Sequence, residues 1–179
     1  MTSGIRFGKV LGAPVVADIS AFVLVLLFAM AVMIDLRVAE VGSSDENWVV
    51  ALLAGVLMVG SVFLHEVTHV AVASNRGLNV RMIRIYLFGG YSVIDGDPSP
   101  STEFFVAISG PIMSLVLGGA AWIVSGALGD DTSLGRAAFA LAIGNIAIGL
   151  FNLIPGFPLD GGRALRGLLA SGSMDRLTA

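Results

Sequence analysis

The segment "WVVALLAGVLMVGSVFLHEVTH", residues 48–69, is apolar from Trp48 to Leu64 and then carries His65, Glu66 and His69. A membrane-spanning helix needs about 20 predominantly apolar residues, so this segment is long enough to cross a bilayer. Its two histidines are the only histidines in the chain. An ionisable side chain within a membrane is costly and marks a functional site by default. The segment therefore predicts a membrane helix with a functional group of side chains near one end.

The composition of the whole chain is typical of a membrane protein. Of its 179 residues, 56% are hydrophobic and only 13% are charged, whereas soluble domains carry about 25% charged residues. Three further apolar segments, at residues 19–34, 104–129 and 137–159, are long enough to cross, the first with help from its flanks. We expect an all-α polytopic membrane protein with about four transmembrane helices and one core domain over residues 1–179. No basic cluster indicates a nucleic-acid partner.

The basic residues predict the orientation of these helices. Arg37 and Arg136 lie in the two connections on one side, and the other eight of the ten basic residues lie on the opposite side. Because positively charged loops stay in the cytoplasm, we expect both termini to be cytoplasmic, in the plasma (inner) membrane. The first segment has a signal-peptide alternative, with a small-residue cleavage site at "AMA", residues 29–31. The apolar run continues past that site, which favours a helix.

Residues 79–94, "NVRMIRIYLFGGYSVI", lack a helical pattern. Their alternation predicts two short strands joined by a turn at Gly89–Gly90, which is a membrane-associated β-hairpin. The hairpin either dips into the membrane against protein or lies on the bilayer surface, because irregular backbone at membrane depth needs protein or water around it.

The stretch His65-Glu66-Val67-Thr68-His69 has the H-E-x-x-H pattern. Residues i and i+4 of a helix share one face, so both imidazoles can bind one ion, and the glutamate can contact a water beside it. This is the pattern of a zinc hydrolase. The alternative is a chance pair of histidines bonded to carbonyls or water. A bound cation is favoured, because three ionisable groups in an apolar segment need a partner.

Catalytic zinc usually takes three protein ligands and leaves a fourth position open. The chain has no cysteine and no third histidine, so the third ligand has to be a carboxylate. Asp160 lies in "NLIPGFPLDGG", residues 152–162, where prolines and glycines interrupt the fourth apolar segment. Asp160 is the candidate ligand. The alternative is that it only starts the turn "LDGG".

The H-E-x-x-H motif in an apolar helix, followed by "NLIPGFPLDGG", resembles the site-2 protease family of intramembrane zinc metalloproteases. "FGGY" at residues 88–91 and "SGP" at residues 109–111 also fit, and the resemblance runs from the second apolar segment to Arg163. It implies one Zn²⁺ per chain, held by His65, His69 and Asp160. It implies that Glu66 is catalytic.

The resemblance also implies residues that contact the substrate. Asn152 matches a family asparagine thought to contact the substrate backbone or the oxyanion; the alternative is a buried amide bonded to a helix carbonyl. Gly89, Gly90 and Tyr91 match the element believed to hold the substrate as an added strand. The implied function is that of an endopeptidase that cuts membrane-protein substrates, such as membrane-anchored regulatory factors, within or near their transmembrane segments in the lipid bilayer.

Two features distinguish subgroups of this family. The chain resembles the subgroup without a PDZ insert, and it ends at Ala179, soon after the "NLIPGFPLDGG" motif. We therefore expect that a C-terminal regulatory region is absent from the chain.

Two other function classes use the same residues. A zinc or proton transporter could relay ions through His65, His69 and Asp160, but no second acidic or histidine site lies deep in another segment. A non-catalytic receptor with a structural zinc would need four protein ligands, and only three candidates appear. The lack of a second ionisable site and the lack of a fourth ligand both favour the endopeptidase.

Overall fold

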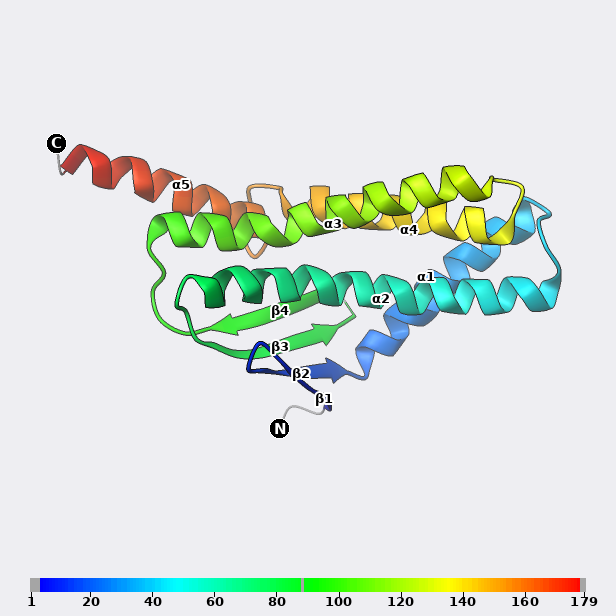
Figure 1. Cartoon of the computed structure of the whole chain (residues 1–179), viewed down its shortest axis with the longest axis horizontal. Coiled ribbons are helices and arrows are strands. Elements are labelled where there is room, and N and C mark those ends of the chain that lie inside the picture. Colours follow the sequence, from blue (N-terminus) through cyan, green and yellow to red (C-terminus); the bar gives the residue numbers. More distant parts are fainter. Residues whose placement is uncertain (1–3, 88, 178–179) are drawn as a thin grey trace.

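The computed structural model describes residues 4–87 and 89–177, with side chains to residue 171, so Phe88 of the "FGGY" motif lies outside the described residues. Its elements, in chain order, are β1 Gly4–Val10, β2 Ala13–Asp18, α1 Ser20–Val38, α2 Ser44–Asn75, β3 Val80–Tyr86, β4 Gly89–Ile94, α3 Pro100–Leu128, α4 Ser133–Asn152 and α5 Asp160–Leu177. Figure 1 shows α2, α3 and α4 running along the long axis of the molecule, with α1 crossing beside them.

Helices α1 to α4 confirm the expected membrane-spanning architecture. Among the described residues, these four helices are long and apolar enough to cross a membrane. Large apolar side chains such as Leu26, Leu53 and Ile123 are exposed along them. The inner faces carry smaller residues: Ala51, Ala54 and Ala137 pack with Val32 and Leu36 in a core shared by α1, α2 and α4. Small residues let membrane helices approach closely, and the large ones then face lipid.

The β-structure is larger than the predicted hairpin. Strands β1 to β4 form one sheet in sequence order, in which β1–β2 and β3–β4 pair antiparallel and β2–β3 pair parallel. The predicted turn at Gly89–Gly90 is wrong: Gly89 pairs with Tyr86 and Gly90 pairs with Ile85, so both glycines belong to β4. Strands β1 and β2 were not predicted from the sequence, since β1 contains Gly4 and Gly8 and is mostly exposed, and β2 is only six residues long.

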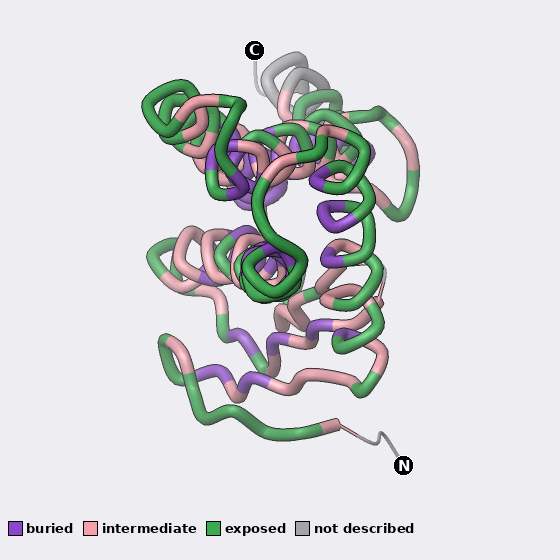
Figure 2. The backbone as a smooth tube through the Cα atoms, turned by 90° about the vertical axis from the view of Figure 1, so that its right-hand side faces the viewer, coloured by how far each residue is buried: buried purple, intermediate pink, exposed green. Residues whose placement is uncertain are grey.

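The sheet lies against the C-terminal half of α2, as Figure 1 shows. Its core consists of Val15 and Ile83 from the sheet, Val70 and Ala73 from α2, and Val106 from α3. In Figure 2 the buried stretches of the sheet lie in the inner strands, while β1 at the outer edge is exposed. Strand β4 is the other edge of the sheet and packs on α2.

Helix α4 ends before the end of the fourth apolar segment. Helix α4 stops at Asn152, residues 153–159 form turns, and α5 begins at Asp160. The prolines and glycines in this stretch break the helix as expected. A close approach explains one glycine: a Cβ at Gly161 would collide with the carbonyl oxygen of Leu153. Beyond the break, α5 continues in the same general direction as α4 and packs on α3 (Figure 1).

Candidate metal centre

Helix α2 brings His65, Glu66 and His69 into the interior of the protein. All three are buried, with 4 or 5% of their surface exposed. One ligand atom from each lies within 4.8 Å of the others, and this is the arrangement expected for residues i, i+1 and i+4 of one helix. The motif therefore forms a compact group of potential ligands below the surface.

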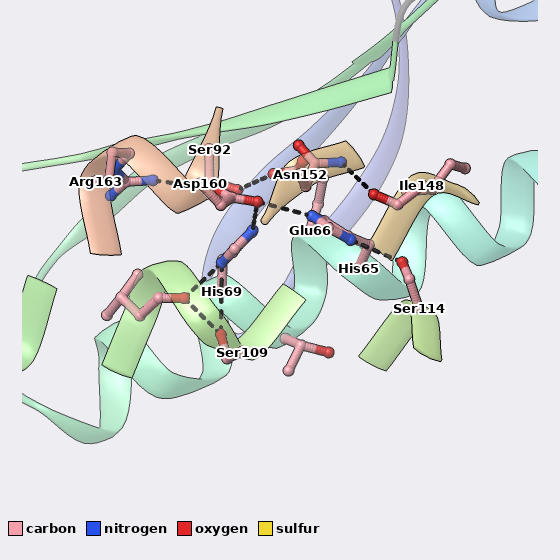
Figure 3. Close-up of polar contacts among 12 residues, drawn as sticks. His65, Glu66, His69, Ser92, Ser109, Ser114, Ile148, Asn152, Asp160 and Arg163 are labelled. Atoms are coloured by element: carbon pink, nitrogen blue, oxygen red, sulfur yellow. Dashed lines mark hydrogen bonds and ion pairs between the residues drawn. The ribbon is translucent and has the colours of Figure 1, made fainter. Parts of the chain in front are cut away.

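The first residue of α5 completes this group. The Oδ2 atom of Asp160 lies 3.2 Å from Nε2 of His65 and 3.2 Å from Nε2 of His69 (Figure 3). Burial raises the pKa of the Asp160 carboxyl, but the contacts with the two imidazoles outweigh it, so the pKa lies below its ordinary value. The tertiary structure thus joins residues 91 and 95 positions apart, as the sequence-based hypothesis for a third ligand requires.

Helix α3 orients both imidazoles through their Nδ1 atoms, the ring nitrogens that do not face Asp160. The Nδ1 atom of His69 donates to the backbone carbonyl of Val106 at 2.7 Å, and Nδ1 of His65 lies 2.9 Å from the hydroxyl of Ser114. A carbonyl only accepts, so the proton of a neutral His69 resides on Nδ1 and its Nε2 lone pair points at Asp160. Such partners fix the tautomer and the ring orientation of metal-binding histidines.

These three atoms fit a divalent cation. A lone pair of His69 and a carboxylate oxygen face each other, and a positive charge between them satisfies both. In a tetrahedral zinc site with ligand bonds of about 2.0–2.2 Å, neighbouring ligand atoms are separated by roughly 3.3–3.6 Å, and the shorter bonds give the lower value. The observed 3.2 Å separations lie close to that lower value. Two imidazoles and a carboxylate are also a common donor set for catalytic zinc.

The glycine and serine of α3 have a second role that sequence analysis missed. The sequence shows Gly110, Ser114 and Gly118 at four-residue spacing, and this pattern indicates only close helix packing. Gly118 does pack against α4 at Ile146. However, Ser114 contacts His65, and a Cβ at Gly110 would collide with Nε2 of both histidines. The four-residue spacing alone does not distinguish residues that pack against a helix from residues that contact the histidines.

A cavity of about 300 Å³ opens onto the group. It is lined by residues of α2, β4, α4, α5 and the turns before α5, including Glu66, Gly89, Gly90, Tyr91, Asn152 and Asp160. The structure therefore brings every residue of the predicted site to one cavity. The roles of these residues in substrate contact stay predictions.

Asn152 lies at the end of α4, at the wall of this cavity. Its Nδ2 donates to the carbonyl of Ile148 at 3.0 Å (Figure 3). This contact is the alternative that the sequence left open for the amide, a bond to a helix carbonyl. The catalytic role of Asn152 stays a prediction.

Comparisons with known proteins agree on one family. The profile of peptidase family M50 matches residues 53–131 and 130–177. A Synechocystis sp. protein provisionally named zinc metalloprotease sll0528 is 36% identical over 174 residues, which cover 94% of this chain and 45% of that protein. Zinc metalloprotease MJ0392 of Methanocaldococcus jannaschii is 33% identical over 171 residues, covering 95% and 47%. The chain thus spans less than half the length of these relatives.

A solved structure shares the fold. The site-2 protease from Methanocaldococcus jannaschii matches with a TM-score of 0.67 and 31% sequence identity, over 94% of this chain and 73% of that one. Together with the four apolar helices, these matches indicate an integral, multi-pass membrane protein.

Proposed function

The chain belongs to peptidase family M50, and from this membership we propose that it is an intramembrane zinc endopeptidase. The observation that carries the proposal is the convergence of Nε2 of His65, Nε2 of His69 and Oδ2 of Asp160, with Glu66 beside them. Three protein ligands leave a coordination position open, which is the arrangement of catalytic zinc. Residues 1–179 form the core domain that carries this activity.

The residues of this chain divide the work of peptide hydrolysis. His65, His69 and Asp160 would hold the zinc ion, which would supply Lewis-acid chemistry and make water at the site more acidic. Glu66 accepts the proton of the attacking water and returns it to the leaving nitrogen. Asn152 gives one N–H of its amide to the developing oxyanion, while the other N–H donates to the carbonyl of Ile148.

Strand β4 is the proposed docking element for the substrate. It is an edge strand, and Gly89, Gly90 and Tyr91 line the cavity that contains Glu66. A helical substrate hides its peptide bonds in its own hydrogen bonds and has to unwind before it is cut. An edge strand offers the unwound segment new backbone partners by strand addition. The substrate class is therefore a transmembrane segment of a membrane-anchored protein, within the lipid bilayer.

Transport of zinc or protons is the weaker proposal. The described residues contain one group of three potential ligands, at His65, Glu66 and His69, and a relay needs further sites along the path. The relatives are also named for metalloprotease activity.

Cleavage of a model transmembrane peptide by wild type and Glu66→Gln in lipid vesicles tests the function. We expect Glu66→Gln to bind zinc at the wild-type stoichiometry and to lose cleavage by at least about 100-fold, because general-base catalysis contributes 10²–10⁴-fold. Metal analysis on the same samples separates a lost base from a lost ion. A Glu66→Gln protein that cleaves at the wild-type rate contradicts the assignment. Zinc flux without proteolysis by wild type favours the transporter.

A further inference from the structure

Strand β4 contacts the glutamate of the motif through two alternate residues. Side chains two residues apart in a strand point to the same face, and Gly90 and Ser92 both face Glu66. A Cβ at Gly90 would collide with the side chain of Glu66, so the strand approaches this residue closely. Tyr91, between them, is 43% exposed. The strand thus presents one face to Glu66 and carries a large exposed side chain on the other.

Ser92 holds one oxygen of the buried carboxylate. Its hydroxyl donates to Oε2 of Glu66 at 2.9 Å. Among the hydrogen bonds found for the described residues, the one from Ser92 is the one that this carboxylate accepts, and Glu66 as a whole residue is only 5% exposed. The bond limits rotation of the carboxylate and leaves the other oxygen free to accept a proton. Figure 3 places both residues with the candidate metal ligands.

We propose that Ser92 is a positioning residue that orients the Glu66 carboxylate toward the attacking water. The inference rests on the proposed function and extends it, because the strand that would receive the substrate also aligns the base. A carboxylate free to rotate still accepts protons, but it spends less time in the productive geometry, and small displacements of catalytic groups lower the rate strongly. If Ser92 only packed against Glu66, its hydroxyl would not be needed. The positioning role requires the hydroxyl.

Three variants of the full chain test the proposal in lipid vesicles. Ser92→Ala removes the hydroxyl, and Ser92→Thr keeps it on a residue that suits a strand. Ser125→Ala is the matched control, since it removes one hydroxyl bond far along α3, from Ser125 to the backbone carbonyl of Gly135 in α4. We expect Ser92→Ala to lower kcat about 10-fold with KM within about twofold, Ser92→Thr to restore most of the rate, and Ser125→Ala to match wild type.

A second set of measurements does not depend on substrate cleavage. In the Glu66→Gln background, photocrosslinking of a model transmembrane peptide measures whether β4 still receives it, and metal analysis measures bound zinc. We expect Ser92→Ala to change neither crosslinking nor zinc content. An unchanged kcat in Ser92→Ala overturns the inference, as does a loss of crosslinking or of zinc, which would give Ser92 a docking or structural role. Absence of cleavage by wild type itself overturns the proposed function, and the inference with it.

Discussion

At the level of single residues, Gly110 shows how closely α3 approaches the metal centre. A Cβ there would collide with Nε2 of His65 and Nε2 of His69, the atoms that face Asp160. Only glycine allows this approach, because it has no side chain to fill the space. The glycine of the "SGP" motif is thus explained by the two imidazoles that it faces.

We expect Gly110→Ala to abolish zinc binding, because the methyl group displaces both imidazoles from the cation. Zinc affinity measured by competition with a chromophoric chelator should fall by more than about 100-fold. Gly119→Ala is the control on the same helix, where a Cβ meets nothing within 4 Å. Equal zinc affinity in the two variants would show that α3 does not constrain the site.

At the level of elements, α5 reaches the site through its contact with α3. The guanidinium of Arg166 pairs with Glu103 near the start of α3, with its Nε 3.1 Å from each carboxylate oxygen. The Glu103 side chain is 8% exposed, so it depends on this cation. Since Asp160 begins α5, the pair also helps to set where the third ligand lies.

We expect Arg166→Gln to lower the free energy of unfolding by about 1–3 kcal/mol, the cost of leaving a buried polar group without its partner. Zinc affinity should fall with it. Arg136→Gln is the matched control, because its partner Asp35 is 47% exposed, and an exposed pair contributes about 0–1 kcal/mol. Denaturant unfolding in mixed micelles measures both. A greater loss of unfolding free energy in Arg136→Gln than in Arg166→Gln would show that the Arg166–Glu103 pair does not stabilise the contact between α5 and α3.

A second pair, Asp18 and Arg84, ties β2 to β3 where α1 begins. Asp18 accepts hydrogen bonds from the backbone N–H of Ser20 at 3.1 Å and from Arg84 at 2.9 Å. The Ser20 bond, and then the Arg84 bond, lower the pKa of Asp18 from its ordinary value. A lowered pKa stabilises the fold above the unfolded-state value of about 3.9, and this contribution is lost as the pH falls through the folded-state value.

Wild type should therefore be more stable than Asp18→Asn at neutral pH, and the difference should shrink as the pH falls from about 5 to 3. Thermal unfolding of both proteins in the same detergent, at several pH values, measures this difference. Other carboxyl groups titrate alike in both proteins and cancel. A difference that is constant over this range would mean that Asp18 does not stabilise the fold through its charge.

At the level of the whole molecule, the sheet and α5 lie at one end and the α1–α2 and α3–α4 connections lie at the other (Figure 1). The end with the sheet carries Arg76, Arg81, Arg84, Arg163 and Arg166. By the rule that positive loops remain in the cytoplasm, we expect this end to be cytoplasmic. In that orientation, water would reach the metal centre from the cytoplasmic side.

The lack of cysteines makes this orientation testable, because an introduced cysteine is unique. Asp130 and Asp97 are both exposed, in the α3–α4 connection and near the sheet respectively. We expect a membrane-impermeant maleimide to label Asp130→Cys in intact cells and Asp97→Cys only after permeabilisation. The cysteine-free wild type is the control for background labelling, and the reverse pattern would invert the proposed topology.

The sequence by itself determined the membrane helices, the H-E-x-x-H group and the candidate third ligand. These features are local: apolar length sets a membrane span, and helical periodicity places His65 and His69 on one face. Asp160 was found by elimination among ligand types and by the broken helix before it. Strands β1 and β2 escaped prediction, because both are short and β1 is mostly exposed, so neither carries a strong hydrophobic pattern of its own.

Only the tertiary structure decided which residues support this group. Ser92 and Ser114 lie 26 and 49 positions from their partners Glu66 and His65, and nothing in the local sequence around either serine indicates the contact. Gly110 has a specific role only because α3 packs against the histidine face of α2. Contacts between distant segments depend on how whole elements pack, and no short-range pattern of residues encodes that packing.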